Sequence, residues 1–119
     1  MALPRHRSLS PALFYLSLLL LFSPAFATPQ SRGLVEEYIE QGEIQFSRSN
    51  WEGAIKELQA ALRLDPSRVD VRTNLGMAYY FKSDLRAAES EFQTVLRTDP
   101  QRGDAAFGLG LVLYEKGDL

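Results

Sequence analysis

The sequence contains no cysteine, and its single histidine is His6, close to the start of the chain. Disulfide bonds, cysteine nucleophiles, Cys/His zinc sites and Ser-His-Asp triads are therefore excluded from the rest of the chain. Residues 28–119 are mildly acidic, with 15 acidic and 11 basic side chains, and this balance disfavours a nucleic-acid binder with a basic footprint. The whole chain has 119 residues, which is long enough for one modest hydrophobic core.

The first 27 residues contain no acidic side chain. Arg5 and Arg7 precede an apolar run over residues 12–22, and Ser23-Pro24 then breaks the pattern ahead of Ala25-Phe26-Ala27. This order predicts a cleavable signal peptide over residues 1–27, cut after Ala27, and hence export to a periplasm or the cell exterior. The alternative is an uncleaved anchor, but an 11-residue run is short of the roughly 20 residues that cross a bilayer. We expect no membrane span after cleavage.

The remaining chain repeats itself with a period of 34 residues. The prolines of Leu64-Asp65-Pro66 and Thr98-Asp99-Pro100 are 34 positions apart. The same shift aligns three glycines, two alanines, two pairs of large apolar residues, three aromatic residues and three polar residues at a turn: Gly42, Gly76 and Gly110; Ala54 and Ala88; Leu58 and Phe92; Leu62 and Leu96; Phe46, Tyr80 and Tyr114; Asn50, Asp84 and Asp118. Several matched columns at one period indicate an array of similar units.

Each unit has the pattern of two amphipathic helices. Asn50 and Asp84 are predicted N-caps, Asp65-Pro66 and Asp99-Pro100 are helix stops, and Gly117 is a predicted C-cap. The expected helices cover residues 35–47, 51–63, 69–82, 85–97 and 104–115. Residues 28–34 are expected to be a linker, followed by a first unit over 35–68, a second over 69–102, and the first helix of a third over 103–119.

These residues resemble the tetratricopeptide repeat (TPR) family. The resemblance rests on the period and on Leu75-Gly76, Tyr79-Tyr80, Ala88, Phe92 and Pro100 in the second unit. The first unit is divergent, with Gln41 and Gln45 at the positions of Leu75 and Tyr79. The resemblance implies an all-α, TPR-type solenoid of antiparallel helix pairs, with about two and a half repeats. The positions expected to build it are Gly42, Ala54, Leu58, Pro66, Leu75, Gly76, Tyr79, Ala88, Phe92, Pro100 and Gly110.

The physical role of these positions follows from size. Gly42, Gly76 and Gly110 are expected to leave no side chain where the first helix of a unit crosses the second. Leu58 or Phe92 then fills the space between the helices.

The resemblance also implies a concave groove, lined by the first helices of successive units, in which a partner segment lies. Phe46, Tyr80 and Tyr114 would form an aromatic ladder along it, and acidic residues at one end would suit a partner with basic and apolar side chains. The alternative is that the ladder is packing between helices and the glutamates form a solvated face. By position, the groove residues are Glu36, Ile39, Glu40, Glu43, Phe46, Asp70, Thr73, Asn74, Met77, Tyr80, Phe81, Asp104, Phe107, Leu111 and Tyr114.

One subfamily, the carboxylate-clamp co-chaperones, is disfavoured. Its groove needs basic and amide side chains for a terminal carboxylate. Only Asn74 matches, and Ile39, Glu43, Asp104 and Gly108 stand where the others are wanted.

No catalytic constellation is found in the sequence. Glu36 and Glu40 lie one helical turn apart and fit the exposed face of a helix, and Gly108-Leu109-Gly110 lies inside a predicted helix rather than after a strand. We expect no cofactor and no enzymatic activity. Trp51, at a helix start, is expected to be a packing lid rather than a ligand platform.

The last predicted helix is apolar on more than one side, with Phe107, Leu109, Leu111, Val112, Leu113 and Tyr114. Since a solenoid end is normally polar, we expect this surface to be covered by a following helix, a partner or a second copy of the chain. The sequence thus favours an exported, non-catalytic interaction scaffold. The alternative is the N-terminal interaction module of a longer enzyme or transporter whose catalytic domain lies beyond Leu119.

Overall fold

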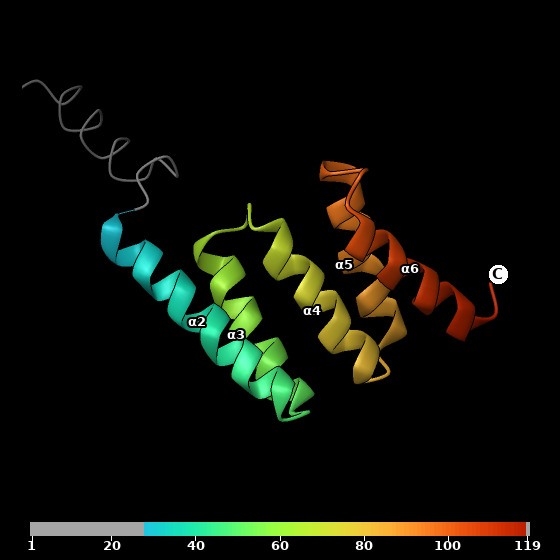
Figure 1. Cartoon of the computed structure of the whole chain (residues 1–119), viewed down its shortest axis with the longest axis horizontal. Helices are drawn as coiled ribbons and strands as arrows, with labels where there is room; N and C mark the ends of the chain where they lie inside the picture. Colours follow the sequence, from blue (N-terminus) through green and yellow to red (C-terminus); the bar gives the residue numbers. More distant parts are fainter. Residues whose placement is uncertain (1–27, 119) are drawn as a thin grey trace, which may run out of the picture.

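The computed structural model describes residues 28–118, and within them it contains five α-helices and no strand (Figure 1). The predicted signal peptide, residues 1–27, lies outside the described residues. The helices are α2 (Pro29–Ser47), α3 (Trp51–Leu64), α4 (Val69–Phe81), α5 (Leu85–Thr98) and α6 (Gly103–Lys116). The all-α solenoid predicted from the sequence is therefore confirmed.

The helices form two layers. The pairs α2/α3 and α4/α5 are packed side by side, while α3 contacts α4 and α5 contacts α6. A direct contact also joins α4 to α6. As a result α2, α4 and α6 line one side of the molecule in Figure 1, with α3 and α5 on the other. No helix within residues 28–118 has the length and apolar character that crossing a membrane requires.

Except for the start of α2, the predicted helix ends are confirmed to within one or two residues. The side-chain oxygens of Asn50 and Asp84 accept hydrogen bonds from the backbone N–H groups of Gly53 and Ala87, at 3.1 and 3.2 Å. Both residues thus satisfy donors that the first turn leaves without a partner. Asp65 and Asp99, each before a proline, leave the helical conformation with φ of −139° and −133°.

The linker expected over residues 28–34 is wrong, because α2 begins at Pro29. Thr28 is the N-cap of α2, and its hydroxyl accepts a hydrogen bond from the backbone N–H of Ser31 at 3.3 Å. Proline at the first helical position needs no hydrogen-bond partner and has a φ suited to the helix. The Thr28-Pro29 pair therefore starts a helix where the apolar periodicity alone does not.

Two large side chains lie at the centres of the helix pairs. Leu58 and Phe92 are almost completely buried, and each lies against the glycine of its own unit. A Cβ atom added to Gly42 would be 3.0 Å from Leu58, and one added to Gly76 would be 2.7 Å from the ring of Phe92. The close approach predicted for these two glycines is confirmed.

Gly110 departs from that prediction. A Cβ atom placed there meets no atom within 4 Å, because no second helix of the third unit lies among the described residues. It is Gly108 that makes the close approach in α6, where an added Cβ would overlap the ring of Phe92. Phe92 therefore holds two helices together through two glycines, one on α4 and one on α6.

Candidate partner-binding groove

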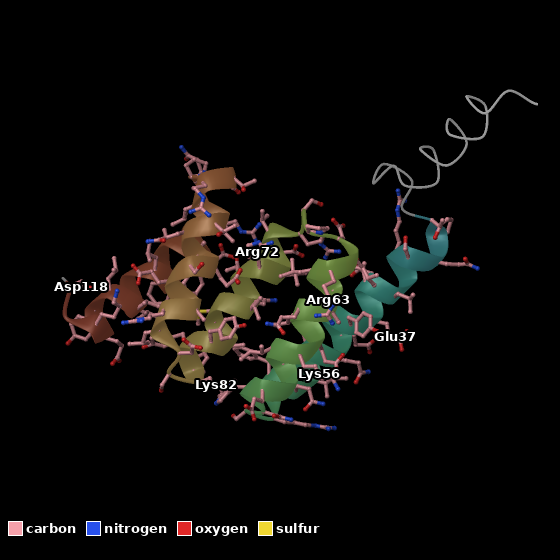
Figure 2. All side chains as sticks on the ribbon, turned by 180° about the vertical axis from the view of Figure 1, so that it is seen from behind. Glu37, Lys56, Arg63, Arg72, Lys82 and Asp118 are labelled. Carbon is pink, nitrogen blue, oxygen red and sulfur yellow. The ribbon has the colours of Figure 1, made fainter. Side chains whose placement is uncertain are left out.

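The surface formed by α2, α4 and α6 presents most of the predicted groove residues to solvent. We call this surface the groove. Its exposed members are Glu36, Glu40, Glu43, Asn74, Phe81, Asp104, Phe107 and Tyr114. The half-buried members are Phe46, Asp70, Met77, Tyr80 and Leu111. The back of the molecule carries charged side chains, including Lys56, Arg63 and Lys82 (Figure 2).

Two predicted groove residues are not available to a partner. Thr73 is 3% exposed, and its hydroxyl donates a hydrogen bond to the carbonyl oxygen of Val69 at 2.8 Å. Ile39 is buried in the core of the first unit. Both side chains point into helix contacts, so the assignment of Thr73 and Ile39 to the groove surface is wrong.

The aromatic residues form a cluster rather than the expected ladder. Trp51 stacks on Phe81 with ring centroids 4.9 Å apart, and Phe46 lies edge-on to both rings at 5.1 and 5.7 Å. Tyr80 packs edge-on against Phe81 at 5.5 Å. We call these four residues the aromatic cluster; it joins the start of α3 to the ends of α2 and α4.

The aromatic cluster bears on two predictions, the role of Trp51 and the length of the aromatic ladder. Trp51 packs against Phe46 and Phe81, as expected of a packing lid. Tyr114 is 73% exposed and makes no ring contact among the aromatic residues described, so the ladder does not continue to α6. Edge-on and offset pairs of this kind stabilise by about 0.5–1.5 kcal/mol each beyond the area they bury.

A pocket of about 180 Å³ opens into the groove between α2 and α4. We call it the α2–α4 pocket. Its walls are mostly apolar, with Phe46 on one side and Leu58 of α3 at its inner end. Glu43, Ser47 and Asn74 supply its polar atoms. It is the feature of the groove that most resembles a binding site, since binding pockets combine apolar walls with a few polar groups.

The acidic residues of the groove fall into two kinds. Glu36 is paired with Arg68 at 2.6 Å, and Arg68 also binds Asp70 at 2.8 Å. The hydrogen bonds that Arg68 donates, to Asp70 first and to Glu36 second, raise the pKa of Arg68, and the hydrogen bond from Arg68 lowers the pKa of Asp70. These three charges link the first unit to the second. Glu40 and Glu43, by contrast, form no ion pair with any residue in the described range.

Tyr80 is joined to the third unit through Glu115. Its hydroxyl lies 3.4 Å from a carboxylate oxygen of Glu115. Desolvation, and then the neighbouring carboxylate, raise the pKa of Tyr80. The Tyr80 hydroxyl donates this hydrogen bond, which joins α4 to α6.

The surface of α6 that faces away from α5 is apolar and uncovered in the described part of the chain. Phe107 and Tyr114 are 66% and 73% exposed, and Leu111 and Leu113 are half-buried. Leu109, which the sequence also placed on this surface, instead packs against the core formed by α5 and α6, and Val112 is fully buried in that core. This arrangement agrees with the expectation of an apolar end. Within residues 28–118 no cluster of three or more acidic side chains has a geometry that could hold a metal ion.

These observations define a class of protein: a helical repeat array with a lined groove. A TPR repeat model matches residues 42–83, and a second tetratricopeptide repeat model matches residues 73–119. The chain belongs to the tetratricopeptide repeat family, as the sequence resemblance predicted. A search of curated proteins finds no match. Repeats of this family generally mediate protein–protein interaction and are typically non-catalytic modules.

Sequence reasoning missed two parts of the site. In the sequence, Gly108 stands only in a phosphate-loop-like pattern and at a position where a carboxylate clamp would have a basic side chain. In the structure, it contacts the ring of Phe92. The α2–α4 pocket was not foreseen either. Its signal was present in the 34-residue register, where Leu58 aligns with the larger Phe92 and Asn74 with the smaller Gly108.

Proposed function

We propose that this chain is an exported, non-catalytic interaction scaffold whose groove binds an extended segment of a partner protein. The observation that carries the proposal is the α2–α4 pocket, which opens on the groove side of a tetratricopeptide repeat array beside Glu43, a carboxylate with no ion-pair partner within residues 28–118. An apolar pocket beside uncompensated negative charge suits a segment that carries both apolar and basic side chains.

Binding is tested by capturing partners from the exported fraction of the source cells. The full chain is compared with a Glu40→Lys/Glu43→Lys double variant, which reverses the groove charge at two exposed positions. We expect the wild-type chain to enrich a defined set of proteins that the variant fails to retain. Lys56→Glu on the back of the molecule is the matched control, because it also reverses an exposed charge but leaves the groove unchanged. Equal retention by all three chains would count against binding in the groove.

Export rests on residues 1–27 and is tested separately. We expect these residues, fused to a reporter that is active only after export, to direct it out of the cytoplasm. The exported chain is expected to begin at Thr28, which mass spectrometry of the intact protein measures. A chain that keeps Met1 and sediments with membranes would instead support the uncleaved anchor.

A further inference from the structure

The two complete units differ at the position that fills the space between helices. In the second unit the ring of Phe92 lies between α4 and α6 and contacts both Gly76 and Gly108. In the first unit the same positions hold Leu58, Gly42 and Asn74. Leu58 reaches Gly42 but is smaller than phenylalanine, and the α2–α4 pocket of about 180 Å³ remains between α2 and α4. The first unit thus leaves open a space like the one that the second unit fills with its own aromatic ring.

We propose that the α2–α4 pocket is an anchor subsite that takes one aromatic side chain of the partner segment, flanked by basic residues. The proposal rests on the proposed function and names the chemistry of the partner. The volume is sufficient, because an apolar cavity of about 150 Å³ in a protein accommodates benzene. The inserted ring would contact Phe46 and Leu58.

The negative charges on α2 indicate which partner residues should flank the inserted ring. Glu43 lines the pocket, and Glu40 lies one turn earlier on the same helix. Both are exposed and form no ion pair among the described residues, so basic side chains next to the inserted ring would meet negative charge on α2. Asn74 adds an exposed amide at the pocket edge, with both a donor and an acceptor for the backbone of an extended segment.

Tryptophan provides an intrinsic fluorescent probe for the α2–α4 pocket. Trp51 is the only tryptophan, and it contacts Phe46, which lines the pocket. A ring inserted against Phe46 changes the surroundings of the stacked Trp51–Phe81 pair. Tryptophan fluorescence therefore follows occupancy of the pocket without an added label.

The test uses three short acetylated, amidated peptides and the full chain. The first peptide has a central phenylalanine with two lysines on each side, the second has alanine in place of phenylalanine, and the third has glutamates in place of the lysines. The pocket is filled from within by Leu58→Phe/Asn74→Gly, which copies the residues of the second unit into the first. Asn74→Gly alone is the matched control, since it shares the helix-weakening glycine but leaves the pocket open. Thermal unfolding by circular dichroism checks that both variants fold.

We expect the phenylalanine–lysine peptide to bind and to shift the Trp51 emission. The alanine peptide and the glutamate peptide are each expected to bind at least about tenfold more weakly. The alanine peptide has no ring to bury, and the glutamate peptide has lost the charge attraction to α2. The double variant should lose affinity for the first peptide by at least about tenfold relative to Asn74→Gly.

Three results would overturn the inference. If the phenylalanine and alanine peptides bind equally, or if the double variant binds like its control, the pocket is not an anchor. In that case, binding in the groove would still be supported if Glu40→Lys/Glu43→Lys lowers the affinity for both peptides. If none of the peptides binds, the proposed partner chemistry is wrong, and the capture experiment alone decides the proposed function.

Discussion

At the residue scale, Gly76 and Gly110 occupy equivalent positions of the 34-residue repeat but have different surroundings. Gly76 lies against the fully buried ring of Phe92, which Gly108 holds on its other side. The ring has no room to move away from an added methyl group. Gly110 occupies the equivalent position in α6, but a Cβ atom added there would meet no atom of another element of the described chain within 4 Å.

We therefore expect Gly76→Ala to lower the free energy of unfolding by about 1–3 kcal/mol, the cost of overpacking a core. Gly110→Ala should raise it by about 0.5–1 kcal/mol, because alanine is the better helix former and nothing obstructs its methyl group. Urea unfolding monitored by circular dichroism measures both. A destabilising Gly110→Ala would show that another helix, from this chain or a partner, covers α6 in solution.

At the element scale, the same turn ends the first helix of each unit. Ser49 and Ser83 have positive φ values of 56° and 67°, and Gly117, at the corresponding place in the third unit, has 78°. L-residues other than glycine are disfavoured in this left-handed region, because Cβ comes too close to the following carbonyl oxygen. Two of the three turns therefore use a residue that is less suited to the conformation.

Replacing Ser83 by glycine copies the third unit into the second. Since left-handed strain of about 1–2 kcal/mol is relieved while glycine gains freedom in the unfolded chain, we expect a net stabilisation of up to about 1 kcal/mol. The melting temperature measures it. Ser83→Val, which is β-branched, is the opposite control and should destabilise.

The N-caps are a second determinant at this scale. Asn50→Ala removes the acceptor for the Gly53 N–H and the donor for the Gln45 side chain, which lies 2.8 Å from the Asn50 amide. We expect a loss of about 1 kcal/mol, the usual cost of an N-cap. Asn50→Asp keeps the cap and removes only the Gln45 contact, so it should cost less. Equal losses for the two substitutions, from denaturant titrations, would contradict the capping role.

At the scale of the whole molecule, ion pairs connect units that are separate in sequence. Arg68 joins Glu36 of α2, 32 residues away, to Asp70 of α4. Arg102 forms a local pair with Asp104, two residues further along the chain at the start of α6, at 2.9 Å. The arginine hydrogen bonds lower the pKa of Asp70 and of Asp104 below the ordinary value of 3.8. A repeat array stays together through contacts between neighbours, so these charges act on its cooperativity.

The sign of the pH dependence follows from these lowered pKa values. A carboxyl whose pKa is lower in the folded state contributes stability at neutral pH, and this contribution is lost as the pH falls below 3.8 through the folded value. Since the side chains of Asp70 and Asp104 are 47% and 54% exposed, solvent screens these pairs, and we expect only a modest fall of the melting temperature as the pH drops from about 4 to about 2. Asp70→Asn should lower the melting temperature at pH 7 and reduce its dependence on pH. An unchanged acid profile in Asp70→Asn would show that other carboxyl groups dominate.

The period, the helices and their caps were predictable from residues close together in the chain. Asn50 caps a helix through the backbone N–H three residues later, and Asp65 leaves a helix because the next residue is proline. Such interactions do not depend on which helix lies alongside. The early start of α2 is also local, but it is marked by Thr28-Pro29 and not by the apolar periodicity, which begins only at Val35.

The tertiary structure alone decided what occupies the space between helices. Thr73 was predicted in the groove and is buried, and Gly108 proved to be the glycine that touches Phe92. The α2–α4 pocket depends on Leu58 being too small to fill the distance between α2 and α4. The sequence by itself thus determined the repeat family and the order of helices, since these follow from local periodicity and capping. Which side chains are buried and where a pocket stays open depend on the combined sizes of residues from three helices, so only the packed structure shows them.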